Sequence, residues 1–254
     1  MGPADSVAKN FRAALSRAFE EAIRPIRSST GTLGVLFSGG VDSSLLAWEL
    51  LRRPEVALYT VGREGSHDLR AGREGAERLG LPWRGLPVGL HEVRGAFDRF
   101  EEELAGLPDV TRAVLVALAL AIERASPPRL VCGQGVDELF LGYAHYRNLS
   151  PVDVELRARA DLEKLHRVDW PRTQRIAAKS RKELLAPFLA PPFEEEALRI
   201  PTELRLPGDA PKKFFREWAV ERGLPPEVAY RPKKAVQYGS GVATLVRRLG
   251  RAGV

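Results

Sequence analysis

"LGVLFSGGVDSSLLAWEL" occupies residues Leu33–Leu50 and joins an apolar run to a helix-forming run through a serine and two glycines. The apolar run predicts a buried strand, and the run after Gly40 predicts a helix with an acid, Asp42, in its first turn. In a doubly wound sheet, ligands bind where the carboxyl end of a strand turns into a helix. The stretch therefore predicts a ligand site on a strand–loop–helix unit.

The loop in this stretch has the composition of a phosphate site. Six positions carry it: Ser38, Gly39, Gly40, Asp42, Ser43 and Ser44. Glycines let backbone N–H groups approach an anion, the helix start adds positive potential, and the serines add hydroxyl donors. Asp42 would repel a phosphate unless a divalent cation lay between them, and Mg²⁺ commonly bridges carboxylates to phosphates. The stretch lacks the Walker spacing, so we predict a different loop for Mg-bound pyrophosphate, in preference to a plain capped glycine turn.

Strand and helix patterns alternate around this loop. Strands are expected at 32–37, 55–61, 81–88 and 129–132, and helices at 6–24 (ending at Pro25), 43–53, 68–79, 91–104 and 110–125. This alternation predicts an α/β fold with a doubly wound parallel sheet. We expect an N-terminal helix over 1–30, a nucleotide-binding core over 31–150 and a helical C-terminal part over 151–254 that completes the active site.

Composition narrows the class of protein. The chain has 254 residues, 44% of them hydrophobic and 28% charged, with neither a membrane-length apolar run nor a secretory h-region. We therefore expect a cytoplasmic protein with no membrane partner. The single cysteine, Cys132, excludes an intrachain disulfide. The net charge of +6 fits either a nucleic-acid face or a polyphosphate site on an Arg-rich background.

SGGVDSS resembles the signature of the PP-loop ATP pyrophosphatases, which cleave ATP between its α and β phosphates. Further stretches resemble parts of the synthetase domain of glutamine-hydrolysing asparagine synthetase, and they follow one another in the same order and with roughly the same spacing as in that domain. They are Ser66-His67-Asp68, CGQGVDELFLGY (132–143), ELLAPFLAPPF (183–193) and RPKKAVQYGSG (231–241). The resemblance covers most of the chain and implies a PP-loop fold that uses ATP and Mg²⁺.

The resemblance also implies a role for individual residues. The six loop positions would hold pyrophosphate and Mg²⁺, with Asp137 as a second metal carboxylate; a helix cap is the alternative for Asp137. The adenosine pocket would comprise Phe37, Val61 and Gly133, although any buried strand supplies residues like the first two. Lys233, Glu183 and Gln134 match catalytic positions.

Three departures bear on the substrate. Gln134 replaces a glutamate and cannot act as a general base, Leu185 replaces an arginine suited to clamping a carboxylate, and Ala190 replaces an aspartate. Gly2 follows Met1, where fused members of the family expose a catalytic cysteine. We therefore expect the nitrogen to come from free ammonia, another amine or a separate glutaminase.

The sequence favours an ATP-dependent, AMP-forming amide ligase that adenylates a small carboxylate, aspartate by resemblance. Two alternatives stay open: a PP-loop tRNA-modifying enzyme that adenylates a base, and a non-catalytic nucleotide-binding subunit. Nucleic acid is the less favoured partner, because the basic stretch from Arg157 to Lys182 is typical of solvated helix faces. Homo-oligomerisation is left open.

Overall fold

A computed structural model describes residues 3–53, 55–147, 149–206, 211–231 and 239–251. Contacts divide the chain into two compact units, each of which we describe by itself. Unit 1 comprises 1–30, 133–169 and 186–230; unit 2 comprises 31–132, 170–185 and 231–254. This division differs from the linear one expected from sequence, because the described residues of 170–185 and of the C-terminal stretch from 231 are grouped with the sheet.

Unit 2 contains a five-stranded, wholly parallel sheet in the order β3-β2-β1-β4-β5. Its strands are β1 Leu33–Leu36, β2 Val56–Gly62, β3 Trp83–Pro87, β4 Arg129–Val131 and β5 Glu183–Leu185. Successive strands add on one side of β1 up to β3, and the chain then returns to the other side of β1 with β4. The parallel doubly wound fold is confirmed, and β1 stands at its topological switch point.

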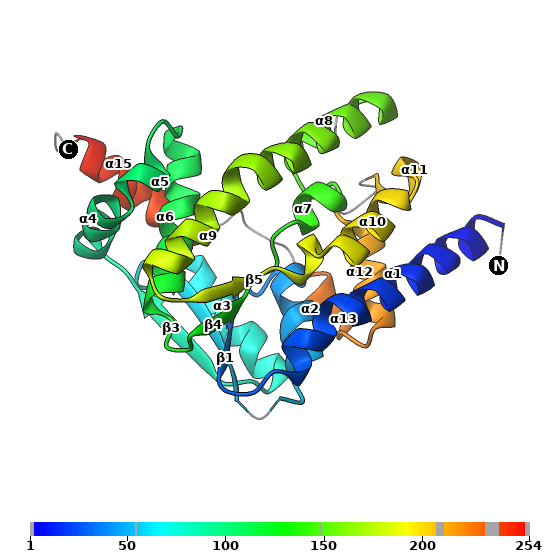
Figure 1. Cartoon of the computed structure of the whole chain (residues 1–254), viewed down its shortest axis with the longest axis horizontal. Coiled ribbons are helices and arrows are strands. Elements are labelled where there is room, and N and C mark those ends of the chain that lie inside the picture. The colour runs from blue at the N-terminus through cyan, green and yellow to red at the C-terminus, as the bar shows by residue number, and fades with distance from the viewer. Residues whose placement is uncertain (1–2, 54, 148, 207–210, 232–238, 252–254) are drawn as a thin grey trace. The chain divides into compact units, whose positions relative to one another are not determined.

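Helices complete unit 2 around this sheet (Figure 1). They are α2 Val41–Leu50, α3 His67–Leu79, α4 Leu90–Arg99, α5 Glu101–Leu104, α6 Asp109–Arg124, α9 Trp170–Lys179 and α15 Val242–Arg251. Helix α3 packs on β2 and β3, and α6 packs on β2 and against α9 and α15. Helix α3 ends where the sequence predicts, because Gly80 adopts φ 64° and donates its N–H to the last turn.

Unit 1 is helical within its described residues. Its elements are α1 Pro3–Ser28, α7 Val136–Leu139, η1 Ala144–Tyr146, α8 Pro151–Lys164, a π-helical turn Leu165–Asp169, η3 Pro187–Leu189, α10 Pro191–Arg199, α11 Thr202–Arg205, α12 Lys213–Glu221 and α13 Pro226–Ala229. An aromatic cluster fills its core: Phe19 stacks on Phe188 with ring centroids 5.3 Å apart and meets Trp218 edge-on at 5.3 Å.

Helix α1 corrects one expectation, since it continues through Pro25 to Ser28. Pro25 lies about one turn from the end of the helix, so its missing N–H affects few of the helix hydrogen bonds. Ile26, the next residue, is buried, and its packing favours continuation of the helix. The Ser28 hydroxyl donates to the Arg24 carbonyl oxygen. Among the described residues, no helix combines the length and apolarity needed to cross a membrane.

Candidate functional site

The loop after β1 adopts a conformation that requires glycine. Gly39 has φ +69°, and a Cβ on it would lie 2.6 Å from Nη1 of Arg231 and 2.7 Å from the Ala71 carbonyl oxygen. A side chain there would be strained by the backbone and obstructed by two neighbours. The loop therefore presents bare backbone at the carboxyl end of β1.

Hydroxyl groups hold this loop in shape. The Ser38 N–H donates to the Ser43 hydroxyl at 3.2 Å, and the Gly40 N–H donates to the Ser38 hydroxyl at 3.3 Å. Gly40 is the N-cap of α2 and has no side chain to cap the helix. The start of α2 thus keeps the positive potential of its N–H groups, as an anion site requires.

Asp42 and Ser44 lie in the first turn of α2 and are buried, with 7% and 0% of their surface exposed. The Ser44 hydroxyl makes no hydrogen bond to any described residue. Nor do three His, Cys, Asp or Glu side chains converge within the described ranges. Mg²⁺ in nucleotide sites commonly takes one or two carboxylates plus phosphate oxygens, so the donors present fit a metal bound together with a polyphosphate.

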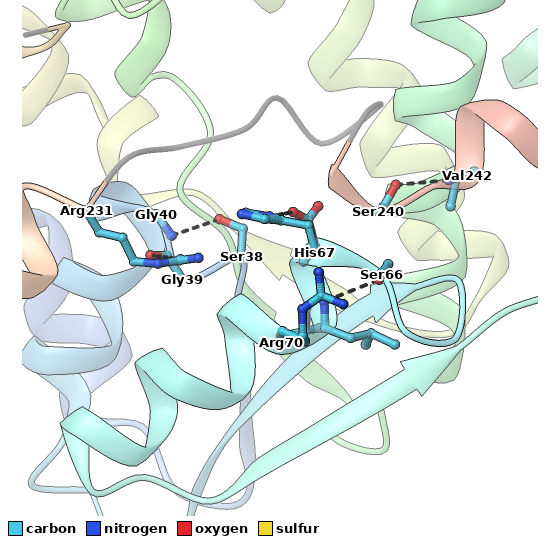
Figure 2. Close-up of polar contacts among 12 residues, drawn as sticks. Ser38, Gly39, Gly40, Ser66, His67, Arg70, Arg231, Ser240 and Val242 are labelled. Carbon is cyan, nitrogen blue, oxygen red and sulfur yellow. Dashed lines mark hydrogen bonds and ion pairs between the residues drawn. The ribbon is translucent and has the colours of Figure 1, made fainter.

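The neighbouring strand contributes a second loop. Ser66 is the N-cap of α3 and accepts from the Leu69 N–H at 3.3 Å. Asp68 is 5% exposed, and a Cβ on Gly239 would overlap its carboxylate. Backbone also joins the two segments, since the Arg63 N–H donates to the Ser240 carbonyl oxygen at 2.8 Å. The glycine-rich end of RPKKAVQYGSG therefore packs beside the carboxyl end of β2 (Figure 2).

The start of the same segment reaches the phosphate loop. Arg231 donates from Nη1 to the Gly39 carbonyl oxygen at 2.9 Å. The sequence gives no sign of this role for Arg231, because its partner is a backbone carbonyl 192 positions away. Lys233 lies outside the described residues, so its catalytic role stays a prediction.

Of the three residues expected to form the adenosine pocket, two lie in unit 2 and one in unit 1. The Phe37 ring packs against α3, where a Cβ on Gly75 would lie 3.1 Å from its Cζ, and Val61 is buried in β2. The Phe37 carbonyl oxygen accepts from the Thr60 hydroxyl at 2.6 Å. Both side chains are buried, and their part in an adenosine pocket stays a prediction. Gly133 belongs to unit 1, and its share in a pocket stays a prediction.

Glu183 does not join the phosphate loop. It pairs in register with Arg129, which in turn pairs with Leu33, the first residue of β1. In a parallel sheet this register places Glu183 at the amino ends of the strands, whereas the loop leaves the carboxyl end of β1. Its carboxylate forms an ion pair with Arg129. The structure therefore gives Glu183 a structural partner and does not support a catalytic role.

In unit 1, Asp137 pairs with a lysine that sequence reasoning missed. Lys212 is 3% exposed and its Nζ lies 2.7 Å from Oδ1 of Asp137. A Cβ on Gly142 would overlap both side chains, so the pair packs closely against this glycine, although the Asp137 side chain remains 25% exposed. The helix-cap alternative for Asp137 is wrong, because Gly135 is the N-cap of α7. Lys212 itself has φ +59°, a backbone conformation that the sequence did not signal.

The structure also describes other side chains of the motif CGQGVDELFLGY (132–143). Glu138 is buried, and burial raises its pKa to about 7. The Tyr143 hydroxyl donates to Oε1 of Glu138 at 2.6 Å. Gln134 is half-buried two residues before α7. Asp42 and Asp137 lie in different units, so their joint binding of one metal ion stays a prediction.

Comparisons with known proteins show what the chain is similar to. The family model described as asparagine synthase matches residues 14–157 and 150–251. A putative glutamine-hydrolysing asparagine synthetase of Methanocaldococcus jannaschii is 29% identical, over 93% of this chain and 51% of its own. The glutamine-hydrolysing asparagine synthetases of Gallus gallus and Homo sapiens are 30% and 31% identical, over 89% and 87% of this chain and 43% and 42% of theirs.

The chain thus spans about half the length of these relatives, or less. Among solved structures, a predicted subunit of tRNA methyltransferase from Methanocaldococcus jannaschii matches 80% of this chain and 93% of its own, at 20% identity and a TM-score of 0.40.

Proposed function

Because this chain belongs to the asparagine synthase family, we propose that it is an ATP-dependent, AMP-forming amide ligase. In this proposal a carboxylate attacks the α-phosphate of ATP, pyrophosphate leaves, and ammonia or another amine displaces AMP from the acyl adenylate. Family membership suggests aspartate as the carboxylate. Leu185 and Ala190 in place of charged residues make another small carboxylate an alternative.

The observation that carries the proposal is the glycine-based loop at the start of α2. Its left-handed Gly39 and the hydroxyl contacts within the loop fix its shape, and an N-cap without a side chain leaves the donors at the helix start held in place before the ligand arrives. Donors fixed in this way stabilise the charge of a leaving pyrophosphate without reorganising during the reaction. Bound Mg²⁺ would neutralise the phosphates, with Asp42 and Asp137 as the proposed ligands, and Lys233 would face the same charge.

The test is product analysis with Mg·ATP, aspartate and ammonium, with AMP resolved from ADP. We expect AMP and pyrophosphate in equal amounts, dependent on a carboxylate. Asp42→Asn should lower the rate by about 100-fold, the scale of removing one electrostatic stabiliser. The control is Asp109→Asn, which changes another first-turn aspartate, in α6, that is exposed on the surface. That variant should retain the wild-type rate.

A non-catalytic nucleotide-binding subunit is the second candidate. Gln134 cannot act as a base, and Glu183 is engaged by Arg129 at the far edge of the sheet. If ATP binds but no AMP forms with aspartate, other amino acids or tRNA, this candidate replaces the ligase. If AMP forms only with a different carboxylate, the ligase chemistry stays and the substrate changes.

A further inference from the structure

The contact between Arg231 and the phosphate loop is specific to one peptide group. Nη1 of Arg231 donates to the carbonyl oxygen of Gly39 at 2.9 Å, and Arg231 is half-buried beside the loop (Figure 2). Gly39 and Arg231 both belong to unit 2. The guanidinium therefore contacts the backbone of the loop from a segment far away in the sequence.

This contact decides which way the Gly39–Gly40 peptide faces. In a trans peptide the C=O and N–H groups point in opposite directions. Holding the Gly39 oxygen on Arg231 turns the Gly40 N–H to the other side, where it meets the Ser38 hydroxyl at 3.3 Å. Glycine adopts positive and negative φ almost equally, so Gly39 alone does not fix this orientation. A reversed peptide would point a carbonyl oxygen toward the side that the N–H now occupies.

We propose that Arg231 is a positioning residue for the phosphate loop: it locks the Gly39–Gly40 peptide so that its N–H, which meets the Ser38 hydroxyl, and not its carbonyl, lies on the side that receives the polyphosphate. The inference rests on the proposed function, because it assumes that the loop receives a polyphosphate. Arg231 acts through Gly39 and need not contact the ligand. Its loss should therefore weaken the binding of phosphates and leave recognition of the nucleoside unchanged.

A matched control exists on the next loop. Arg70 also donates from Nη1 to the carbonyl oxygen of a glycine with positive φ, Gly65, at 2.6 Å. Arg70 is exposed, and Gly65 has no neighbour within 4 Å of a Cβ position. The Arg70 contact reproduces the chemistry of the Arg231 contact away from the phosphate loop.

The experiment is calorimetric titration of the full chain with inorganic pyrophosphate in Mg²⁺, and separately with adenosine. Arg231→Met should weaken pyrophosphate binding by about 10-fold to 100-fold, as expected for a hydrogen bond to a charged group, with adenosine affinity unchanged. Arg231→Lys keeps one donor and should recover part of the loss. Arg70→Met should match the wild type for both ligands.

Equal pyrophosphate affinity in wild type and Arg231→Met would overturn the inference, and so would parallel losses of pyrophosphate and adenosine. If Arg231→Met does not fold, the lysine variant decides: unchanged or parallel affinities overturn the inference, and a selective loss supports it. A wild-type chain that binds no pyrophosphate would overturn the proposed function itself, which separates the two failures.

Discussion

Gly39 and Gly31 both have a left-handed backbone, with φ of +69° and +84°, but their surroundings differ. A Cβ on Gly31 meets nothing within 4 Å, whereas one on Gly39 meets Arg231 and the Ala71 carbonyl oxygen. Backbone strain alone costs about 1 kcal/mol for alanine at such a position. Alanine at Gly31 therefore measures the free-energy cost of the backbone conformation alone, and alanine at Gly39 measures that cost together with the cost of steric overlap.

We expect Gly39→Ala to lower the free energy of unfolding by more than Gly31→Ala, which should cost only about 1 kcal/mol. Gly39→Ala should also abolish measurable pyrophosphate binding, because Arg231 and the loop must move. Urea unfolding and calorimetric titration of both variants measure these effects. Equal stability losses, with pyrophosphate still bound by Gly39→Ala, would contradict this account of the loop.

At the same scale, the sequence shows the loop residues and Asp137 but not the residues that pair with them. Ser38, Gly39 and Asp42 stand out because their chemistry is unusual at a strand–helix turn. Arg231 and Lys212 do not, because the first acts on a backbone carbonyl and the second depends on burial with Asp137. Neither property follows from residue type or spacing, and both need the folded chain.

Among the elements of unit 1, Arg205 of α11 joins two other helices. It is 2% exposed, and its guanidinium donates to the Leu139 carbonyl oxygen of α7 at 3.0 Å and to the Glu155 carboxylate of α8 at 2.9 Å. Burial lowers the pKa of Arg205, and Glu155 opposes that effect. The charge is thus tolerated in the interior because it is paired.

Arg205→Met keeps the volume but leaves Glu155 and the Leu139 oxygen without this donor. We expect a loss of about 3 kcal/mol in the free energy of unfolding, at the lower end for a broken buried pair because Glu155 is partly exposed. Chemical denaturation measures it.

The control for Arg205→Met is Arg199→Ala, which removes an exposed pair with Glu196 and should cost at most about 1 kcal/mol. A loss for Arg205→Met no greater than that of the control would refute the structural role of Arg205.

Local sequence patterns predict the strands of the sheet, with the exception of β5. The four strands expected from apolar runs are present with shifts of one or two residues at their ends. Strand β5 escapes detection because it has three residues, lies at the sheet edge and is followed by Pro187. Three residues are too few to show a strand period, and the pairing with β4 is visible only in the folded chain.

For the whole molecule, the basic stretch from Arg157 to Lys182 has nine basic and three acidic residues, and its net charge of +6 equals that of the chain. Arginines there pair with acids one turn away: Arg157 with Asp161, Arg159 with Glu155 and Arg167 with Glu163. Local neutralisation leaves less charge to follow a phosphate backbone. Ion pairs of this kind are typical of a solvated helix surface.

We expect this chain to bind tRNA only weakly, with a dissociation constant of about 10⁻⁴–10⁻⁶ M at physiological salt. The affinity should fall steeply between 50 and 200 mM salt and change less than about twofold in an Arg157→Ala, Arg159→Ala double variant. Fluorescence anisotropy with labelled tRNA measures both. Tight binding at 200 mM salt that this double variant abolishes would restore the nucleic-acid alternative.

The interleaving of the two units also affects how the protein is made. Each unit is assembled from three separated stretches of chain, and unit 1 lacks its last stretch until Tyr230 has been synthesised. A growing chain on the ribosome therefore holds an incomplete helical core while the strands up to β4 are already outside the exit tunnel. Exposed apolar surface at that stage invites aggregation and chaperone binding. Splitting the gene at a single point between the codons for Gly31 and Tyr230 would yield fragments that contain neither unit whole.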